Sequence, residues 1–282
     1  MKPAFLILAG LIAIFAISCN KDTGNTQRKL CIIGGGPKPA EMLQLMIRES
    51  GIDKGGYGVV LPMASIQPDT EVLETTTEFL SQGCSTMYGL FVEKGKPVPA
   101  EKLDSIRNAK LIFISGGDQA RFMNAIEGTG VEEAIHEASR KGVLISGTSA
   151  GAAVMSRKMI TGNEHKYPGD SSNFNTIEAG NVEVLTGLGM LTTVIIDQHF
   201  LIRKRLNRLI SVSIENPDEI CAGIDESTAL FVKGNTATVV GSRQVVVLRN
   251  VKKQKREVNG FLGTQGIQLD VLLPGESFDV NE

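Results

Sequence analysis

The chain has 282 residues, of which 42% are hydrophobic and 21% are charged, and its formal net charge is −2. A chain of this length can bury a sizeable core in one or two domains. The near-neutral charge and the absence of tryptophan argue against nucleic acid as a partner, because such surfaces need basic patches and aromatic platforms.

The N-terminal segment predicts export and lipidation. A single lysine precedes an apolar run over residues 4–17, which is too short to span a bilayer comfortably. The run ends in AISC, which resembles a bacterial lipobox whose cysteine, here Cys19, is lipidated and becomes the mature N-terminus. We therefore expect a signal peptide over residues 1–18, a lipidated polar tether over 19–27, and a membrane-anchored lipoprotein of the cell envelope. A cleaved signal with an incidental cysteine is the alternative.

Three further cysteines follow, Cys31, Cys84 and Cys221. Their number is odd, and no pair has the spacing of metal ligands. Cys31 and Cys221 lie in apolar runs, which favours buried free thiols over a structural disulfide.

Strand and helix signals alternate through the first half of the chain. Apolar runs predict strands within residues 29–36, 57–65, 86–93, 110–117 and 143–147. Helical periodicity between them predicts helices over residues 39–51, 69–83, 99–109 and 118–142. This alternation is typical of a parallel sheet that is covered by helices on both faces.

The second half begins with a strand over residues 189–200 and a helix over residues 201–216, which carries arginines at its start. Short β-rich runs follow at residues 220–224, 229–234, 236–241 and 244–250. We expect them to extend the same sheet as antiparallel strands. Since no linker divides the chain, residues 28–282 are predicted to form a single α/β domain. Its fold class is a mostly parallel sheet with helices on both faces and an antiparallel β extension at the C-terminal end.

Two glycine clusters follow predicted strands. Gly34-Gly35-Gly36 does not complete a dinucleotide fingerprint, because Pro39 stands where the third glycine would be. Gly116-Gly117 precedes Asp118 and Gln119 at the end of another strand. Ligands bind at the carboxyl ends of parallel strands, and consecutive glycines expose backbone N–H groups there.

The stretch Gly147-Thr148-Ser149-Ala150-Gly151 fits the G-x-S-x-G pattern at a strand-to-helix turn. Such a turn needs small neighbours and holds the serine Oγ clear of the sheet edge, with the following N–H facing a developing oxyanion. Ser149 is therefore a candidate nucleophile, although a small residue at a tight turn would give the same pattern.

A serine nucleophile needs a base, and the chain offers three histidines. His136 lies among charged residues of a predicted helix, which indicates a solvated position, and His165 lies in a polar loop. His199 ends a predicted strand, where sites of parallel sheets gather, and is the preferred base. For the acid, both Asp197 and Glu226 remain open from spacing alone. The order of serine, histidine and glutamate argues against an α/β-hydrolase, in which the acid precedes the histidine.

Four stretches together resemble the cyanophycinase branch of the serine peptidases that also includes aspartyl dipeptidase E. They are FISGGDQARF, GTSAGAAVMS, IIDQHFLIRKRLNR and GIDESTAL. The resemblance implies a fold similar to class I glutamine amidotransferases, a catalytic triad of Ser149, His199 and Glu226, and a dimer. It also implies that the chain needs no metal or organic cofactor.

The resemblance further implies a substrate site. The family's substrate-recognising residues carry over to Gln119, Asp197, Gln198, Arg203, Arg205 and Arg208. The arginines are expected to bind substrate carboxylates and Asp197 a substrate guanidinium. Backbone N–H groups of Ala150 and of Gly117 and Asp118 are expected to hold the oxyanion.

These expectations predict hydrolysis of arginyl-polyaspartate (cyanophycin) to β-Asp-Arg dipeptides. An exported aspartyl or isoaspartyl dipeptidase is the alternative within the same fold. A binding lipoprotein with a silent peptidase fold is the alternative from another class, and a serine-reactive probe separates it from the first two.

Overall fold

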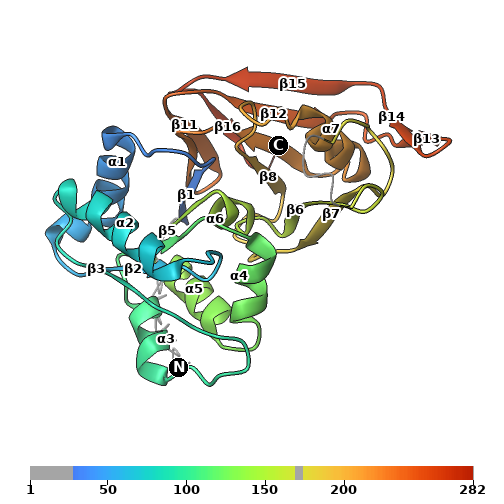
Figure 1. Cartoon of the computed structure of the whole chain (residues 1–282). Helices are drawn as coiled ribbons and strands as arrows, with labels where there is room; N and C mark the ends of the chain where they lie inside the picture. Colours follow the sequence, from blue (N-terminus) through green and yellow to red (C-terminus); the bar gives the residue numbers. More distant parts are fainter. Residues whose placement is uncertain (1–27, 169–173, 282) are drawn as a thin grey trace, which may run out of the picture.

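The computed structural model describes residues 28–168 and 174–281, so the predicted signal peptide and Cys19 lie outside the described residues. Its largest element is an eight-stranded sheet with the order β16-β11-β10-β1-β5-β4-β2-β3 (Figure 1). Five neighbouring strands, from β1 to β3, are parallel, as predicted. They are β1 (Lys29–Ile33), β2 (Gly58–Leu61), β3 (Met87–Gly89), β4 (Leu111–Ile114) and β5 (Leu144–Thr148).

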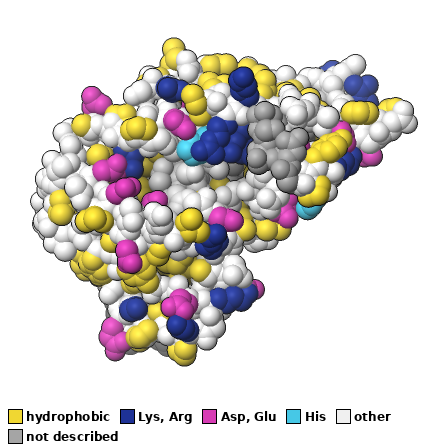
Figure 2. All heavy atoms as spheres, in the orientation of Figure 1, with side chains coloured by type: hydrophobic (Ala, Val, Ile, Leu, Met, Phe, Trp, Pro, Cys, Tyr) yellow, Lys and Arg dark blue, Asp and Glu magenta, His cyan; other side chains and the backbone are white. Residues whose placement is uncertain are grey.

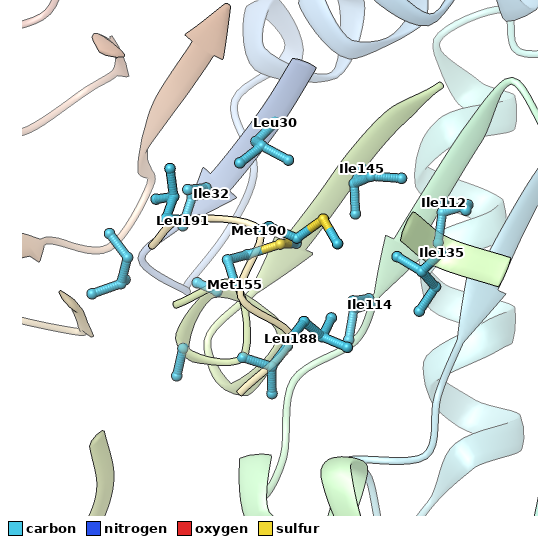
Figure 3. Packing of buried hydrophobic residues seen from close by; sticks show 14 of the residues in the cluster. Leu30, Ile32, Ile112, Ile114, Ile135, Ile145, Met155, Leu188, Met190 and Leu191 are labelled. Carbon is cyan, nitrogen blue, oxygen red and sulfur yellow. The ribbon is translucent and has the colours of Figure 1, made fainter. Parts of the chain in front are cut away.

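Helices cover both faces of this sheet, because alternate residues of each strand point to opposite sides. In β1, Leu30 and Ile32 pack with helices α3 to α6, whereas Cys31 and Ile33 pack with α1 and α2. Figure 3 shows the first of these two cores, in which residues of β1, β4 and β5 meet the segment 188–191. The helices are α1 (Ala40–Ser50), the 3₁₀ turn η1 (Ile52–Lys54), α2 (Pro68–Ser81), α3 (Ala100–Arg107), α4 (Gln119–Ile126), α5 (Val131–Arg140) and α6 (Ala150–Ala153).

The C-terminal strands divide between two sheets. Strands β10 (Thr228–Lys233), β11 (Thr236–Gly241) and β16 (Ser277–Asp279) extend the large sheet with antiparallel pairing, as predicted. Strands β8 (Val194–Gln198), β9 (Ile220–Ile224), β12 (Val245–Asn250) and β15 (Ile267–Leu272) instead form a second sheet, in the order β15-β12-β9-β8. The prediction that all these runs join one sheet is therefore wrong in part.

The physical reason lies in two sharp turns. Ser227 has a φ of 53° between β9 and β10, and Gly241, the last residue of β11, has a φ of 110°. At each turn the chain changes direction and passes from one sheet to the other. Helix α7 (Leu206–Glu215) covers the second sheet and connects β8 to the parallel β9. The helix begins five residues later than predicted, because residues 201–205 form turns.

Two antiparallel hairpins complete the described fold. They are β6 (Lys158–Glu164) with β7 (Val182–Thr186), and β13 (Arg256–Val258) with β14 (Phe261–Gly263). Cys31, Cys84 and Cys221 are buried free thiols, which confirms that prediction. Within residues 28–168 and 174–281, no helix has the length and apolar character needed to cross a membrane.

Candidate active site

Ser149 stands at a strained turn between β5 and α6. Its backbone has φ 53° and ψ −110°, a conformation that non-glycine residues rarely adopt. The two glycines of the G-x-S-x-G pattern are both required by space. A Cβ on Gly147 would overlap the carbonyl of Gly151, and a Cβ on Gly151 would overlap the carbonyl of Ile114. The sequence pattern therefore encodes a close approach of strand and helix that leaves the serine at the carboxyl edge of the sheet.

His199 and Glu226 meet Ser149 from the second sheet. His199 follows β8 and Glu226 follows β9, whereas Ser149 follows β5 of the large sheet. His199 Nε2 lies 2.9 Å from Ser149 Oγ, and His199 Nδ1 lies 2.6 Å from Glu226 Oε1. An ionised carboxylate only accepts hydrogen bonds, so we assign the ring proton to Nδ1. Nε2 is then free to accept the proton of the serine hydroxyl.

The electrostatic surroundings of His199 favour its neutral form. The ring is 7% exposed, and this burial lowers its pKa below the ordinary value. The hydrogen bond to Glu226 acts in the opposite direction, and the positive charges of Arg203 and Arg205 lower the pKa further. A base with a lowered pKa remains unprotonated, and hence competent, at mildly acidic pH.

Two backbone N–H groups close to Ser149 in the sequence or the fold have no acceptor among the described residues. Gly116 packs against Ser149, since a Cβ on Gly116 would lie 3.5 Å from that of the serine. No hydrogen bond within the described chain occupies the N–H of Gly117 or of Ala150. By contrast, the N–H of Asp118 donates to the carbonyl of Ala64 at 2.9 Å. Asp118 caps α4 with its side chain, which accepts from the N–H of Arg121.

The predicted guanidinium partner, Asp197, already has a cation. Both its oxygens accept hydrogen bonds from Arg208, through Nε at 2.7 Å and through Nη2. The side chains are 0% and 2% exposed, and the Arg208 guanidinium also lies 5.1 Å from the centre of the Phe174 ring. Asp197 and Arg208, both predicted to bind substrate, therefore bind each other instead. Neither charged group is exposed to a substrate.

Of the other predicted substrate residues, Arg203 and Arg205 lie nearer the surface, whereas Gln198 and Gln119 are buried. Arg205 donates from Nη1 to the backbone and side-chain oxygens of Gln198, at 2.6 and 2.9 Å. Burial lowers the pKa of Arg205 to about 10, which keeps it protonated at neutral pH. Arg203 is exposed, and none of its guanidinium nitrogens contacts a partner within the described ranges. Gln119 is 4% exposed and donates to the carbonyls of Ile160 and Thr161 at 2.8 and 2.5 Å.

Arg203 and Arg205 precede α7 rather than beginning it. Positive charges near the N-terminus of a helix oppose its dipole, and of the three arginines only Arg208 lies inside this helix. Figure 2 shows Lys and Arg side chains gathered beside a histidine near the middle of one face of the molecule.

The other histidines lie away from this arrangement. His136 bonds the carbonyl of Leu188 at 2.8 Å and is partly buried, so the prediction of a solvated helix position is wrong. The apolar neighbours of α5 bring its ring against segment 188–191. His165 follows β6, and its N–H donates to the carbonyl of Asn181.

Sequence reasoning missed two features of the site. The loop Gly34-Gly35-Gly36 lies directly against His199 and Glu226, although its failed nucleotide fingerprint had removed it from the functional candidates. The signal that could have identified this loop is its position at the carboxyl end of β1, a central parallel strand. Glu183 was also missed, and it accepts from Thr161 and Asn163 at 2.5 and 2.9 Å. These hydrogen bonds lower the pKa of Glu183.

No three His, Cys, Asp or Glu side chains among the described residues are grouped as metal ligands. The described site offers acid–base and nucleophilic groups together with backbone donors.

The sequence was compared with known protein families and relatives. The model of peptidase family S51 matches residues 32–240. Cyanophycinase from Nostoc sp. is 30% identical over 264 residues, which cover 90% of this chain and 86% of that protein. Cyanophycinase from Synechococcus elongatus is 32% identical over 230 residues, covering 78% and 69%. Peptidase E from Actinobacillus pleuropneumoniae serotype 7 is 26% identical over 203 residues, covering 68% and 78%.

A solved structure gives the same picture of the fold. The crystal structure of a peptidase from an acI-B1 Actinobacterium superposes with a TM-score of 0.65 at 21% identity. The match covers 90% of this chain and 98% of that one. It confirms the predicted fold class, a mostly parallel sheet with helices and antiparallel C-terminal strands.

Proposed function

Because the chain belongs to peptidase family S51 and is a serine-type peptidase, we propose that Ser149, His199 and Glu226 form its catalytic triad. The observation that carries this proposal is the continuous hydrogen-bonded path from Ser149 Oγ through the imidazole to Glu226. Three residues from two sheets share this path, with the histidine between a hydroxyl and a carboxylate. That order matches the three roles of nucleophile, base and orienting acid.

The proposed reaction follows from this geometry. Ser149 Oγ attacks the scissile carbonyl while His199 Nε2 takes its proton, and the carbonyl electrons move onto the oxygen. His199 then returns the proton to the leaving amine, the C–N bond breaks and an acyl-enzyme remains. Water attacks the acyl group with His199 again as base, and Ser149 leaves with the proton. Glu226 holds Nδ1–H throughout and stabilises the imidazolium.

We assign the oxyanion donors to the backbone N–H groups of Gly117 and Ala150. Neither has a competing acceptor within the described chain, whereas the N–H of Asp118 is engaged by Ala64. We therefore leave Asp118 out of the oxyanion hole that the sequence led us to expect. Each such donor typically contributes about 3 kcal/mol to the stability of the transition state.

For the substrate, we propose arginyl-polyaspartate, cleaved to β-Asp-Arg dipeptides. Two relatives at 30% and 32% identity are cyanophycinases, and they cover most of this chain. Arg203 and Arg205 place positive charge beside His199, where the free carboxylates of an aspartyl substrate would lie. Arg203 has an unengaged guanidinium for such a carboxylate, and Arg205 is oriented by Gln198.

Within this proposal Asp197 and Arg208 do not bind substrate themselves but hold the backbone next to Gln198 in place. Asp197 immediately precedes Gln198, and Arg208 holds it in place from α7. Gln119 joins the start of α4 to β6 through its bonds to the carbonyls of Ile160 and Thr161.

A second candidate is an exported aspartyl or isoaspartyl dipeptidase. The observation that favours it is the similarity to peptidase E, which extends over 68% of this chain. Both candidates use the same triad and differ in the length of the acidic peptide that the site accepts.

One experiment separates the candidates. The purified protein is incubated with arginyl-polyaspartate or with short α- and β-aspartyl dipeptides, and the products are identified by mass spectrometry. Release of β-Asp-Arg from the polymer supports the first function, and cleavage of dipeptides alone supports the second. Ser149→Ala, which is expected to remain folded, must abolish either reaction. A wild-type protein that cleaves nothing and resists a fluorophosphonate probe would instead be a silent binding protein.

A further inference from the structure

The last residue of β1 and the glycine loop that follows it, together residues 33–36, contact the backbone of every segment that carries a triad residue. Ile33, at the end of β1, accepts a hydrogen bond from the N–H of Ser149 at 3.0 Å, which continues the β1–β5 pairing. In the loop, Gly34 accepts one from the N–H of His199 at 2.7 Å, and Gly35 accepts one from the N–H of Ser227, next to Glu226, at 2.8 Å. Three successive carbonyls therefore bind three segments that lie far apart in the sequence.

These donors share an unusual backbone conformation. Ser149, His199 and Ser227 have φ angles of 53°, 49° and 53°, in the left-handed region that disfavours residues with a side chain. Such residues persist where the surrounding structure fixes them. The hydrogen bonds to the carbonyls of residues 33–35 supply that constraint at all three positions.

The loop also determines where the catalytic side chains fit. A Cβ on Gly35 would overlap the imidazole of His199 and stand 2.5 Å from its Nε2. A Cβ on Gly36 would stand 2.9 Å from the Cβ of Glu226 and 3.1 Å from its Oε2. Glycine at these positions lets the loop backbone lie directly against the ring and the carboxylate.

The triad residues come from two separate sheets, so an element that fixes their relative position is needed. Ser149 belongs to the eight-stranded sheet, and His199 and Glu226 belong to the four-stranded sheet. The described sheets share no strand, so the ladder bonds inside each sheet do not set the distance between hydroxyl and imidazole. The loop leaves β1 of the large sheet and bonds to both.

We infer that residues 33–36 are the positioning element of the triad, which aligns the imidazole of His199 with Ser149 across the junction of the two sheets. This inference rests on the proposed triad and goes beyond it, because it assigns a role to residues that touch no reacting atom of the substrate. The motif Gly34-Gly35-Gly36, which does not complete a dinucleotide fingerprint, thereby has a role in positioning the triad.

The test compares alanine substitutions at two glycines that have nearly the same φ angle. Gly35 has a φ of 111°, and Gly55 has a φ of 112° with nothing within 4 Å of an added Cβ. Gly35→Ala and Gly55→Ala therefore place an alanine at the same φ, and only the first brings its Cβ against His199. The measured quantity is the rate constant for phosphonylation of Ser149 by a fluorophosphonate, in which Oγ bonds to phosphorus, fluoride leaves and His199 takes the proton. Thermal unfolding checks that each variant folds.

We expect Gly35→Ala to react about 10²-fold or more slowly than wild type, since small displacements of catalytic groups have effects of this size. Gly55→Ala is expected to react at the wild-type rate. A folded Gly35→Ala that reacts at the wild-type rate overturns the inference, as does an equal loss in Gly55→Ala. Failure of the wild-type protein to react counts against the triad itself and not specifically against the loop.

A second pair serves if Gly35→Ala does not fold. Gly36 has a φ of 69° and would meet Glu226, and Gly51 has a φ of 70° with nothing within 4 Å. Gly36→Ala moves the carboxylate that raises the pKa of His199, while Arg203 and Arg205 still lower it. The acid limb of phosphonylation therefore shifts to lower pH in Gly36→Ala and stays unchanged in Gly51→Ala. An unshifted limb in a folded Gly36→Ala contradicts the inference.

Discussion

The triad and the neighbouring polar segment of residues 197–208 use similar side chains in different ways. In the triad, Ser149, His199 and Glu226 bond to one another across two sheets, and the carboxylate remains 27% exposed. In the segment 197–208, Asp197 and Arg208 neutralise each other out of contact with solvent. The proposed triad thus keeps its groups accessible to a substrate, whereas the two buried charges of the second region neutralise each other.

This difference teaches that a charged residue in a recognisable motif does not by itself indicate a contact with substrate. A buried pair can hold the backbone beneath a site, and only unengaged groups such as the Arg203 guanidinium are available to bind. The two regions should therefore respond differently to substitution: catalysis fails in the first and folding fails in the buried part of the second.

The largest expected effect is in the triad. Glu226→Gln keeps the shape of the side chain but removes the charge that fixes the ring proton on Nδ1. We expect kcat to fall by about 10⁴-fold, as for the matching change in related triads, with little change in stability. Steady-state kinetics and thermal unfolding measure the two quantities. Glu257→Gln, an exposed position on β13, is the control. A loss of less than about tenfold would remove Glu226 from the triad.

The next effect concerns the buried pair. Asp197→Asn leaves the Arg208 guanidinium buried without a counter-charge, and we expect the free energy of unfolding to fall by about 3–5 kcal/mol. Replacing both residues, as in Asp197→Leu with Arg208→Met, should recover much of that loss. Denaturant unfolding measures each value. The exposed pair of Lys253 and Asp218 is the control, and breaking it should change stability little. An Asp197→Asn variant of wild-type stability and impaired turnover would show a substrate contact instead.

A smaller effect is expected at Arg203, the exposed arginine of the same segment, 197–208. Arg203→Gln removes the unengaged guanidinium, and the loss of one charge-assisted contact of about 1.5–3 kcal/mol should lower kcat/KM for an aspartyl substrate. Unfolding should be unaffected, because the side chain is exposed. The neighbouring exposed Lys204→Gln is the matched control. Equal effects of the two variants would indicate a general electrostatic attraction and not a specific contact.

The smallest effect is a shift in pH dependence. The charge of Arg203 lowers the pKa of His199, although burial is the larger cause. Removing that charge in Arg203→Gln raises the pKa, so the ring becomes protonated, and inactive as a base, at a higher pH. The acid limb of kcat/KM is therefore expected to move towards higher pH, and pH–rate profiles measure it. A limb that stays in place, or that moves equally in Lys204→Gln, contradicts this assignment.

The alternation of strands and helices was enough to predict the parallel part of the large sheet, because buried parallel strands and amphipathic helices have different periods. It was not enough to divide the later strands between two sheets. β9 and β10 are both short and apolar, and only the left-handed turn at Ser227 between them sends the chain to another sheet. The onset of α7 was also misplaced, because residues 201–205 continue the sequence pattern of the helix but fold as turns, with Lys204 at a φ of 53°.

The sequence by itself determined the turn at Ser149, since a G-x-S-x-G run between an apolar strand and small residues allows little else. It also made His199 the preferred base, because the other two histidines have unsuitable surroundings. Spacing alone left Asp197 and Glu226 open as the partner of His199, and the family resemblance implied Glu226. The tertiary structure places Glu226 2.6 Å from His199 and pairs Asp197 with Arg208. These contacts join residues 11 to 50 positions apart. The Ser149–His199 contact depends on how the two sheets meet, and the other two depend on how β8 packs with β9 and α7. Neither local spacing nor side-chain chemistry specifies this packing.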